Sequence, residues 1–208
     1  FLLRESINKQ DILLKEMHHR VKNNLQIVMS LLDIQAKNTT KENLKEFIEN
    51  SHSRIKSMAL LHQNLYLSNS SSCISFQEYL EELTQSIKDC YDMKTIVIKI
   101  YAKEIKLDLN IAIPLGLIIN ELVCNALKHA FRNIDRDNAV VVTINTSTLN
   151  HYILTVSDNG KGMTLLSTKK SKSIGLELVE LLVLQLKGTI YISQNLDRGT
   201  QYQINFKT

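Results

Sequence analysis

The stretch IPLGLIINELVCNALKHAF, residues 113–131, contains the pattern on which the fold prediction depends. Its apolar residues recur at helical spacing, and Pro114 suits a first helical turn, where its missing N–H costs little. One ridge, with spacings of four, four and three residues, contains Leu117, Glu121, Asn125 and Lys128. An amide oxygen can join the coordination shell of Mg²⁺ beside phosphate oxygens, and an ammonium supplies positive charge. The ridge therefore indicates a ligand-binding helix or, more plainly, a solvated polar face.

A second signal is the run YILTVSDNGKGM, residues 152–163. The period of two in a strand places Asp158 on the same face as the apolar Leu154 and Val156. A carboxylate on a covered face needs a polar partner, and the amino group of an adenine is a suitable one. Gly160 and Gly162 allow the backbone conformations and the close approach that a nucleotide-binding loop requires.

The last strand provides an independent test of this arrangement. Thr200 shares a face with Tyr202, Ile204 and Phe206, and Gly199 allows close approach just before it, so Thr200 could meet Asp158 at the covered end of the sheet. Residues 164–173 are rich in Ser, Thr and Lys and could fold over phosphates, although a surface loop has the same composition. The backbone N–H groups near Gly175 and Leu176 offer an anion site at a helix start.

The N-terminal part of the sequence has a different character. Apolar periodicity without Gly or Pro predicts one long helix over 3–37, and a second pattern follows over 44–65 after the polar turn 38–40. Two such helices form an antiparallel hairpin whose apolar stripes need a partner, so we expect a homodimer with a four-helix bundle. The polar run 68–72 is a linker, which divides the chain into domains 1–70 and 71–208.

The second domain is predicted to be an α+β sandwich, with one mixed sheet and helices on one face. Helices are expected over 76–91, 113–131 and 175–186. Strands are expected over 96–101, 140–145, 152–157, 189–193 and 202–206.

Composition limits the class of protein. The 208 residues carry a formal charge of +4 without a block of five or six like charges, which gives nucleic-acid binding little support. The three cysteines have no CxxC spacing, which favours reduced thiols in the cytoplasm over disulfides or zinc. No window approaches the roughly 20 uninterrupted apolar residues of a membrane span. Because the sequence begins at Phe1 in helical rhythm, we expect a piece of a longer protein with its sensor domain upstream.

Three segments occur in a telling order: the ridge with Asn125, the run DNGKG at residues 158–162, and Gly199-Thr200. Together they resemble the ATP-binding fold shared by histidine kinases, gyrase-type ATPases and Hsp90. The run MHHRVKNNLQ, residues 17–26, on the preceding helical pattern adds a phosphoacceptor box. The chain resembles the core of a sensor histidine kinase of the HisKA_2 (HWE-like) subfamily over nearly its whole length. The resemblance implies a phosphoprotein of two-component signalling that uses ATP and Mg²⁺ and passes its phosphoryl group to an aspartate of a response regulator.

The resemblance also implies roles for individual residues. His19 would be the acceptor, with His18 as the alternative because the two lie about 100° apart around a helix. Asn125 would bind Mg²⁺, with Glu121 orienting metal or water. Lys128 and His129 would contact phosphates, and Asp158 would bind the adenine amino group. Gly160, Gly162 and Gly175 would shape the nucleotide loops. Leu176 and Thr200 complete the set of nucleotide-binding residues.

The sequence also fits other interpretations. Many histidine kinases have an acidic residue directly after the acceptor, whereas Arg20 stands here; Glu16, one turn before His19, is the alternative candidate for the base. A phosphotransfer or scaffold protein would have the same bundle with a nucleotide domain that no longer binds. A serine kinase that resembles anti-sigma factors would account for the second domain only and leaves the histidine box unexplained.

Overall fold

The structure, a computed structural model, describes residues 44–67, 73–93, 95–131, 137–148, 150–162, 174–194 and 198–207. The chain divides into two compact units, Phe1–Ser51 and His52–Thr208, and most described residues belong to the second. The predicted first helix, the hairpin turn and the histidine box lie outside the described residues. The predicted domain boundary between residues 70 and 71 stays a prediction.

The described helices and strands follow the expected order closely. The helices are α2 (Leu44–Leu67), α3 (Phe76–Cys90), α4 (Leu109–His129) and α5 (Ile174–Gln185). The strands are β1 (Cys73–Ser75), β2 (Val97–Tyr101), β3 (Lys106–Asp108), β4 (Ala139–Thr148), β5 (His151–Asp158), β6 (Thr189–Gln194) and β7 (Thr200–Lys207).

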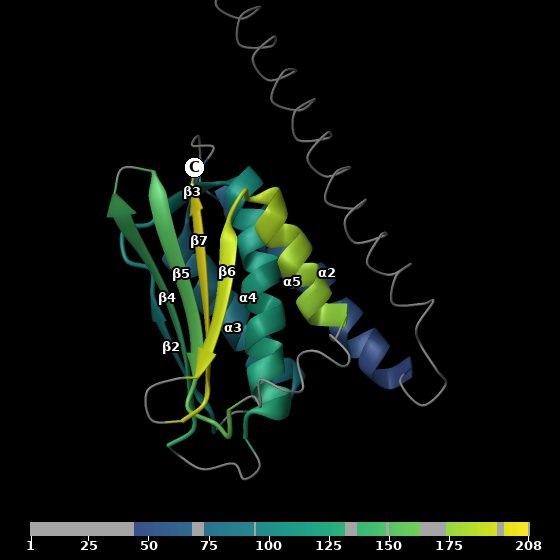
Figure 1. The fold of residues 1–208 in the computed structure, drawn as a ribbon. Coiled ribbons are helices and arrows are strands. Elements are labelled where there is room, and N and C mark those ends of the chain that lie inside the picture. The colour runs from purple at the N-terminus through teal and green to yellow at the C-terminus, as the bar shows by residue number, and fades with distance from the viewer. Residues whose placement is uncertain are drawn as a thin grey trace, which may run out of the picture. The chain divides into compact units, whose positions relative to one another are not determined.

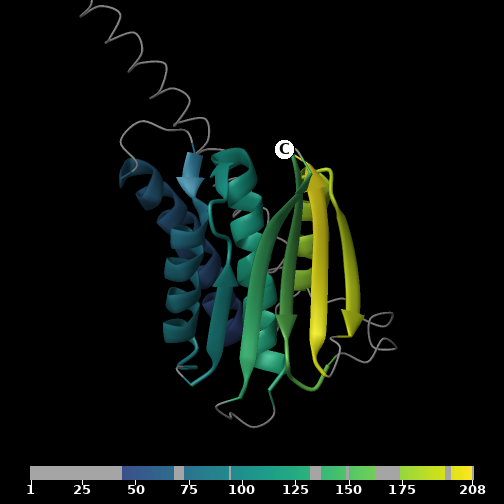
Figure 2. The ribbon, with the colours of Figure 1, turned by 90° about the vertical axis from the view of Figure 1, so that its left-hand side faces the viewer.

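The main sheet has the strand order β2-β4-β5-β7-β6. Strands β2 and β4 are parallel and the other neighbours are antiparallel, so the sheet is mixed. Helices α3, α4 and α5 cover the same face of this sheet (Figures 1 and 2). The predicted α+β sandwich with helices on one face is therefore confirmed.

The core lies between this face and α4, the most buried of the described helices. All residues from Ala112 to Cys124 of α4 are buried, and they pack toward alternating strand residues such as Leu154, Val156 and Ile204. Burial of each large aliphatic side chain contributes about 1.5–3 kcal/mol. Among the described residues, α4 is the one helix that is long and apolar enough to cross a membrane, but 83% of the relevant window is buried inside the fold, as expected of a core helix.

The start of α4 differs from the prediction. The helix begins at Leu109, four residues before the expected start, because Asp108 caps it: Asp108 Oδ1 accepts a hydrogen bond from the N–H of Asn110 at 2.8 Å. The prediction that Pro114 lies in the first turn is thus wrong, since this proline is inside the helix. Its missing N–H removes one bond of the helical ladder, and the buried surroundings of the helix offset that loss.

A small two-stranded sheet was not predicted. Strands β1 and β3 pair antiparallel, with Ile74 opposite Leu107, and both of these side chains are buried. Strand β1 leads directly into α3 and β3 directly into α4, so the pair holds the starts of these two helices together. Three residues are too few for a period of two to stand out in a sequence.

Candidate functional site

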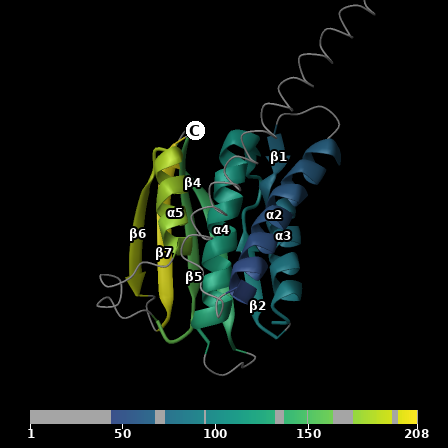
Figure 3. The same cartoon turned by 90° about the vertical axis from the view of Figure 1, so that its right-hand side faces the viewer.

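A cleft of about 380 Å³ lies between α4, the end of β5 and the start of β7. Its walls include the apolar side chains of Leu122, Val156 and Tyr202. Figure 3 shows α4 and α5 side by side next to the sheet, and Leu176, near the start of α5, also lines the cleft. Six residues predicted from the sequence come together here: Asn125, His129, Asp158, Gly162, Leu176 and Thr200.

Asp158 is the buried acid of this cleft. Its Oδ1 atom accepts hydrogen bonds from the backbone N–H groups of Gly160, at 2.9 Å, and Thr200, at 3.3 Å. The predicted meeting of Thr200 with Asp158 is therefore confirmed. Burial raises the pKa of Asp158 above its usual value of 3.8, while the two N–H groups act in the opposite direction. Burial, followed by the charge of Asp158, raises the pKa of Tyr202 to about 12.

Glycines allow the loops around Asp158 to pack closely. A Cβ atom on Gly160 would lie 2.3 Å from the carbonyl oxygen of Ala130, and the N–H of Lys161 donates to that same oxygen at 2.9 Å. Gly199 has a φ of +99°, and a Cβ atom there would lie 2.0 Å from the Asp158 carbonyl oxygen. Both approaches exclude any larger residue, which confirms the close contacts predicted at these glycines.

Asn159 was quoted in the sequence motif without a role, and the structure supplies one. Its Oδ1 atom accepts from the N–H of Ala139 at 2.8 Å, and its Nδ2 atom donates to the Asp137 carbonyl oxygen at 2.7 Å. These bonds join the loop after β5 to the start of β4. An asparagine directly after a strand is the signal that indicates such a side-chain-to-backbone link.

Glu121 is held by a residue that the sequence did not single out. Its two carboxylate oxygens accept from Arg54 on α2, Oε1 from Nε at 2.6 Å and Oε2 from Nη2 at 2.8 Å. Only 6% of Glu121 and 2% of Arg54 are exposed. A Cβ atom on Gly175 would lie 2.7 Å from Glu121 Oε2 and 4.0 Å from Asn125 Nδ2. Glu121, Asn125 and the start of α5 thus converge beside the cleft.

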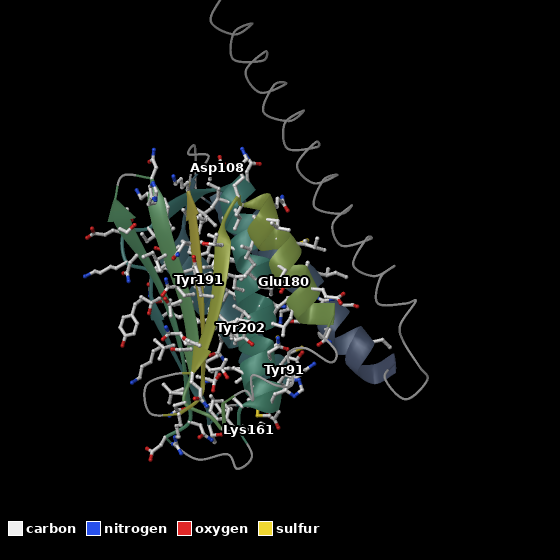
Figure 4. The ribbon with its side chains drawn as sticks, in the orientation of Figure 1. Tyr91, Asp108, Lys161, Glu180, Tyr191 and Tyr202 are labelled. Atoms are coloured by element: carbon white, nitrogen blue, oxygen red, sulfur yellow. The ribbon has the colours of Figure 1, made fainter. Side chains whose placement is uncertain are left out.

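The residues of the predicted ridge on α4 do not all line the cleft. Asn125 lines the cleft, whereas Lys128 does not: its Nζ atom lies over the ring of Tyr91, 5.1 Å from the centroid. The phosphate contact of Lys128 stays a prediction. Lys161, which the sequence analysis did not propose as a site residue, is an exposed cation that lines the cleft near the end of α4 (Figure 4).

The donor set fits a nucleotide with its metal. A buried carboxylate among apolar side chains suits an adenine ring and its amino group. Mg²⁺ at phosphates keeps several waters and needs only one or two protein ligands, and the amide oxygen of Asn125 can supply one. Both oxygens of Glu121 already accept hydrogen bonds from Arg54, so Glu121 would support Asn125 and would not bind the metal itself. Among the described residues, no three His, Cys, Asp or Glu side chains form a metal-binding group.

Comparison with protein families divides the chain into two matching segments. Residues 16–91 match the HisKA_2 family, described as histidine kinase. Residues 110–208 match the family described as histidine kinase-, DNA gyrase B- and HSP90-like ATPase. The second match contains all six predicted residues that line the cleft.

Individual proteins give the same result. Sensor histidine kinase PdtaS of Mycobacterium tuberculosis is 32% identical over 194 residues, which is 92% of this chain and 38% of that protein. The chain therefore spans less than two fifths of this curated relative. The solved histidine kinase domain of the blue-light activated histidine kinase EL346 from Erythrobacter litoralis has a TM-score of 0.66 at 18% identity, covering 89% of this chain and 94% of that one, and so has the same fold.

Proposed function

Since the chain belongs to the histidine kinase family, with a HisKA_2 segment followed by an ATPase segment, we propose that it is an ATP-dependent protein-histidine kinase of two-component signalling. It phosphorylates its own histidine and passes the phosphoryl group to an aspartate of a response regulator. The observation that carries the proposal is the cleft, where Asp158, Thr200 and Asn125 meet on the covered face of the sheet.

In this proposal each cleft residue has a binding task. Asp158 accepts from the adenine amino group, and the apolar walls hold the ring. Asn125 holds the Mg²⁺ that accompanies ATP, which supplies charge neutralisation at the phosphates. Catalysis then depends mainly on positioning, because the transferred group needs little covalent chemistry from the protein.

The acceptor is proposed to be His19, on the strength of the HRVKNNLQ sequence, since this residue lies outside the described part of the chain. An imidazole nitrogen attacks the γ-phosphorus in line. A nitrogen–phosphorus bond forms, the bond from phosphorus to the β–γ bridging oxygen breaks, and ADP leaves. Glu16 is the proposed acceptor of the imidazole proton.

Three further proposals follow from the family. The helical hairpin makes the protein a homodimer, and the receiver domain of a response regulator is its partner. Because ATP and receiver domains are cytoplasmic, we place the reaction in the cytoplasm.

Incubation with γ-labelled ATP and Mg²⁺ tests the function in the wild type, His19→Gln, His18→Gln and Asn125→Ala. We expect acid-labile, alkali-stable label that His19→Gln and Asn125→Ala lose and His18→Gln keeps. Purified receiver domains should then remove the label. Loss in His18→Gln alone would place the acceptor one residue earlier. A folded protein without label and without ATP binding would instead favour a phosphotransfer scaffold.

A further inference from the structure

Polar side chains join α2 to the rest of the second compact unit. The hydroxyl of Ser53 donates to Asn120 Oδ1 at 2.8 Å, and the hydroxyls of Ser57 and Tyr79 are 3.0 Å apart. These side chains are buried, as is Arg54 between them. Among the α2 residues whose burial is described, Met58 is the buried apolar side chain, whereas Ser51, Ser53, Arg54 and Ser57 are buried and polar.

Arg54 carries the charge in this polar contact. Its planar guanidinium is a cation with five N–H donors in a fixed fork, and only 2% of Arg54 is exposed. Its Nε and Nη2 atoms donate to Glu121, while Nη1 is buried and has no hydrogen-bond partner among the described residues. If one partner of a buried pair is removed, the other is left as an uncompensated charge. Arg54 therefore determines the net charge that Glu121 presents to its surroundings.

Those surroundings include the part of the cleft beside Asn125, where the proposed function places Mg²⁺ and the phosphates of ATP. Glu121 lies one helical turn before Asn125 on the same ridge, and its Oε2 atom is in close reach of the backbone of Gly175 at the start of α5. A carboxylate without its cation at this point would repel a triphosphate, and the repulsion would be strong because the site is shielded from water.

We propose that Arg54 is a positioning residue that makes the binding of nucleotide phosphates depend on the docking of α2. The inference rests on the proposed function. Arg54 belongs to the segment that matches the HisKA_2 family and Glu121 to the segment that matches the ATPase family, so the ion pair couples the two. Such coupling is reciprocal: bound nucleotide favours docked α2 as much as docked α2 favours nucleotide.

The test is titration calorimetry of ATP, ADP and adenosine in the presence of EDTA, which removes any metal contribution of Glu121. Arg54→Met should weaken the binding of ATP and ADP about tenfold and leave adenosine unchanged. In Arg54→Met/Glu121→Gln the repelling charge is gone, so ATP binding should return to within about threefold of the wild type. Lys56→Met, which removes an exposed cation from the same helix, is the matched control and should bind like the wild type.

Each other result overturns the proposal. Equal losses for ATP and adenosine would assign Arg54 a purely structural role, and an Arg54→Met protein that binds ATP normally would remove the coupling. If Arg54→Met does not fold, Glu121→Gln decides: it should bind ATP in EDTA at least as tightly as the wild type, and weaker binding contradicts the idea. A wild type that binds no ATP, with or without Mg²⁺, would defeat the proposed function and the inference together.

Discussion

At the scale of single residues, the side chain of Asp158 is buried at the end of β5, and one of its oxygens already accepts two backbone hydrogen bonds. Desolvation disfavours the charged carboxylate, and this shows as a raised pKa. Such a group lowers the stability of the empty protein while it prepares a specific contact for a ligand. The two consequences can be measured separately.

The first prediction concerns the ligand contact. In Asp158→Asn, the amide oxygen can keep the bonds from Gly160 and Thr200, but an NH₂ group then replaces the second carboxylate oxygen. Two donors would face each other at the adenine amino group, so ATP affinity should fall by about tenfold or more. Titration calorimetry measures this loss. Asp137→Asn, at an exposed aspartate, should bind normally, and equal affinities of the two variants would contradict the assigned role.

The second prediction concerns stability and pH. The pKa of Asp158 in the folded protein is raised above its unfolded value of 3.8, so the folded state binds more protons and loses stability as pH rises from 3.8 through the folded pKa. Asp158→Asn lacks this loss. In urea unfolding of the empty proteins, the free energy of unfolding of the variant should therefore increase relative to that of the wild type as pH rises above 3.8. Below pH 3.8 the difference between the two free energies should be constant. A difference that is independent of pH would be inconsistent with a buried charge.

At the scale of elements, α4 depends on features beyond its apolar stripe. Asp108 caps its start, and Gly116 allows α3 to approach so closely that an added Cβ atom would lie 2.1 Å from the Tyr79 hydroxyl. Tyr79 is fully buried, and desolvation raises the pKa of its phenol far above the usual value of 10. The contact between the two helices therefore depends on a glycine that lowers helix propensity.

This contact gives the third prediction. Gly116→Ala should destabilise the protein by about 1 to 2 kcal/mol, because overpacking outweighs the better helix propensity of alanine. The same substitution in a Tyr79→Phe background should cost less, since the nearest clashing atom is gone. Urea unfolding of the four proteins forms a double-mutant cycle. Equal costs in both backgrounds, or a stabilised Gly116→Ala protein, would show that the helices adjust without strain.

At the scale of the whole molecule, the family matches place two functional segments in one chain. Helix α2 carries exposed isoleucines at Ile48 and Ile55, two helical turns apart on one side, although it also carries the buried polar contacts to α4. Exposed large apolar residues at this spacing are typical of a helix that packs against a further helix. This pattern agrees with the proposed dimer.

The fourth prediction is therefore an assembly state. Sedimentation equilibrium of the protein should give twice the chain mass of 23.8 kDa. Ile48→Glu/Ile55→Glu should shift it toward the monomer, because two buried charges oppose helix packing. The control Leu181→Glu/Leu184→Glu changes two exposed leucines of α5 and should stay dimeric. Monomeric wild type, or the same effect from both pairs, would exclude association through this side of α2.

Much of the fold was determined by the sequence alone, because periodicity is local. Alternation along β5 and β7 placed Asp158 and Thr200 on the covered face, and the structure brings them within hydrogen-bond distance. The mixed sheet with helices on one face followed from the order of the same patterns. Glycines at 160 and 199 indicated close approach before any neighbour was known, since only the absence of a side chain permits it.

Tertiary structure alone decided which partners these faces meet. The pair of Arg54 and Glu121 joins residues 67 positions apart, and nothing in the spacing of either helix selects the other. Lys128 shares a ridge with Asn125, yet it lies over Tyr91 instead of lining the cleft, because a ridge sets the order of side chains and the packed neighbours set their direction. The physical reason is range: hydrogen bonding and side-chain period act over a few residues, whereas burial and charge pairing depend on the whole packed fold.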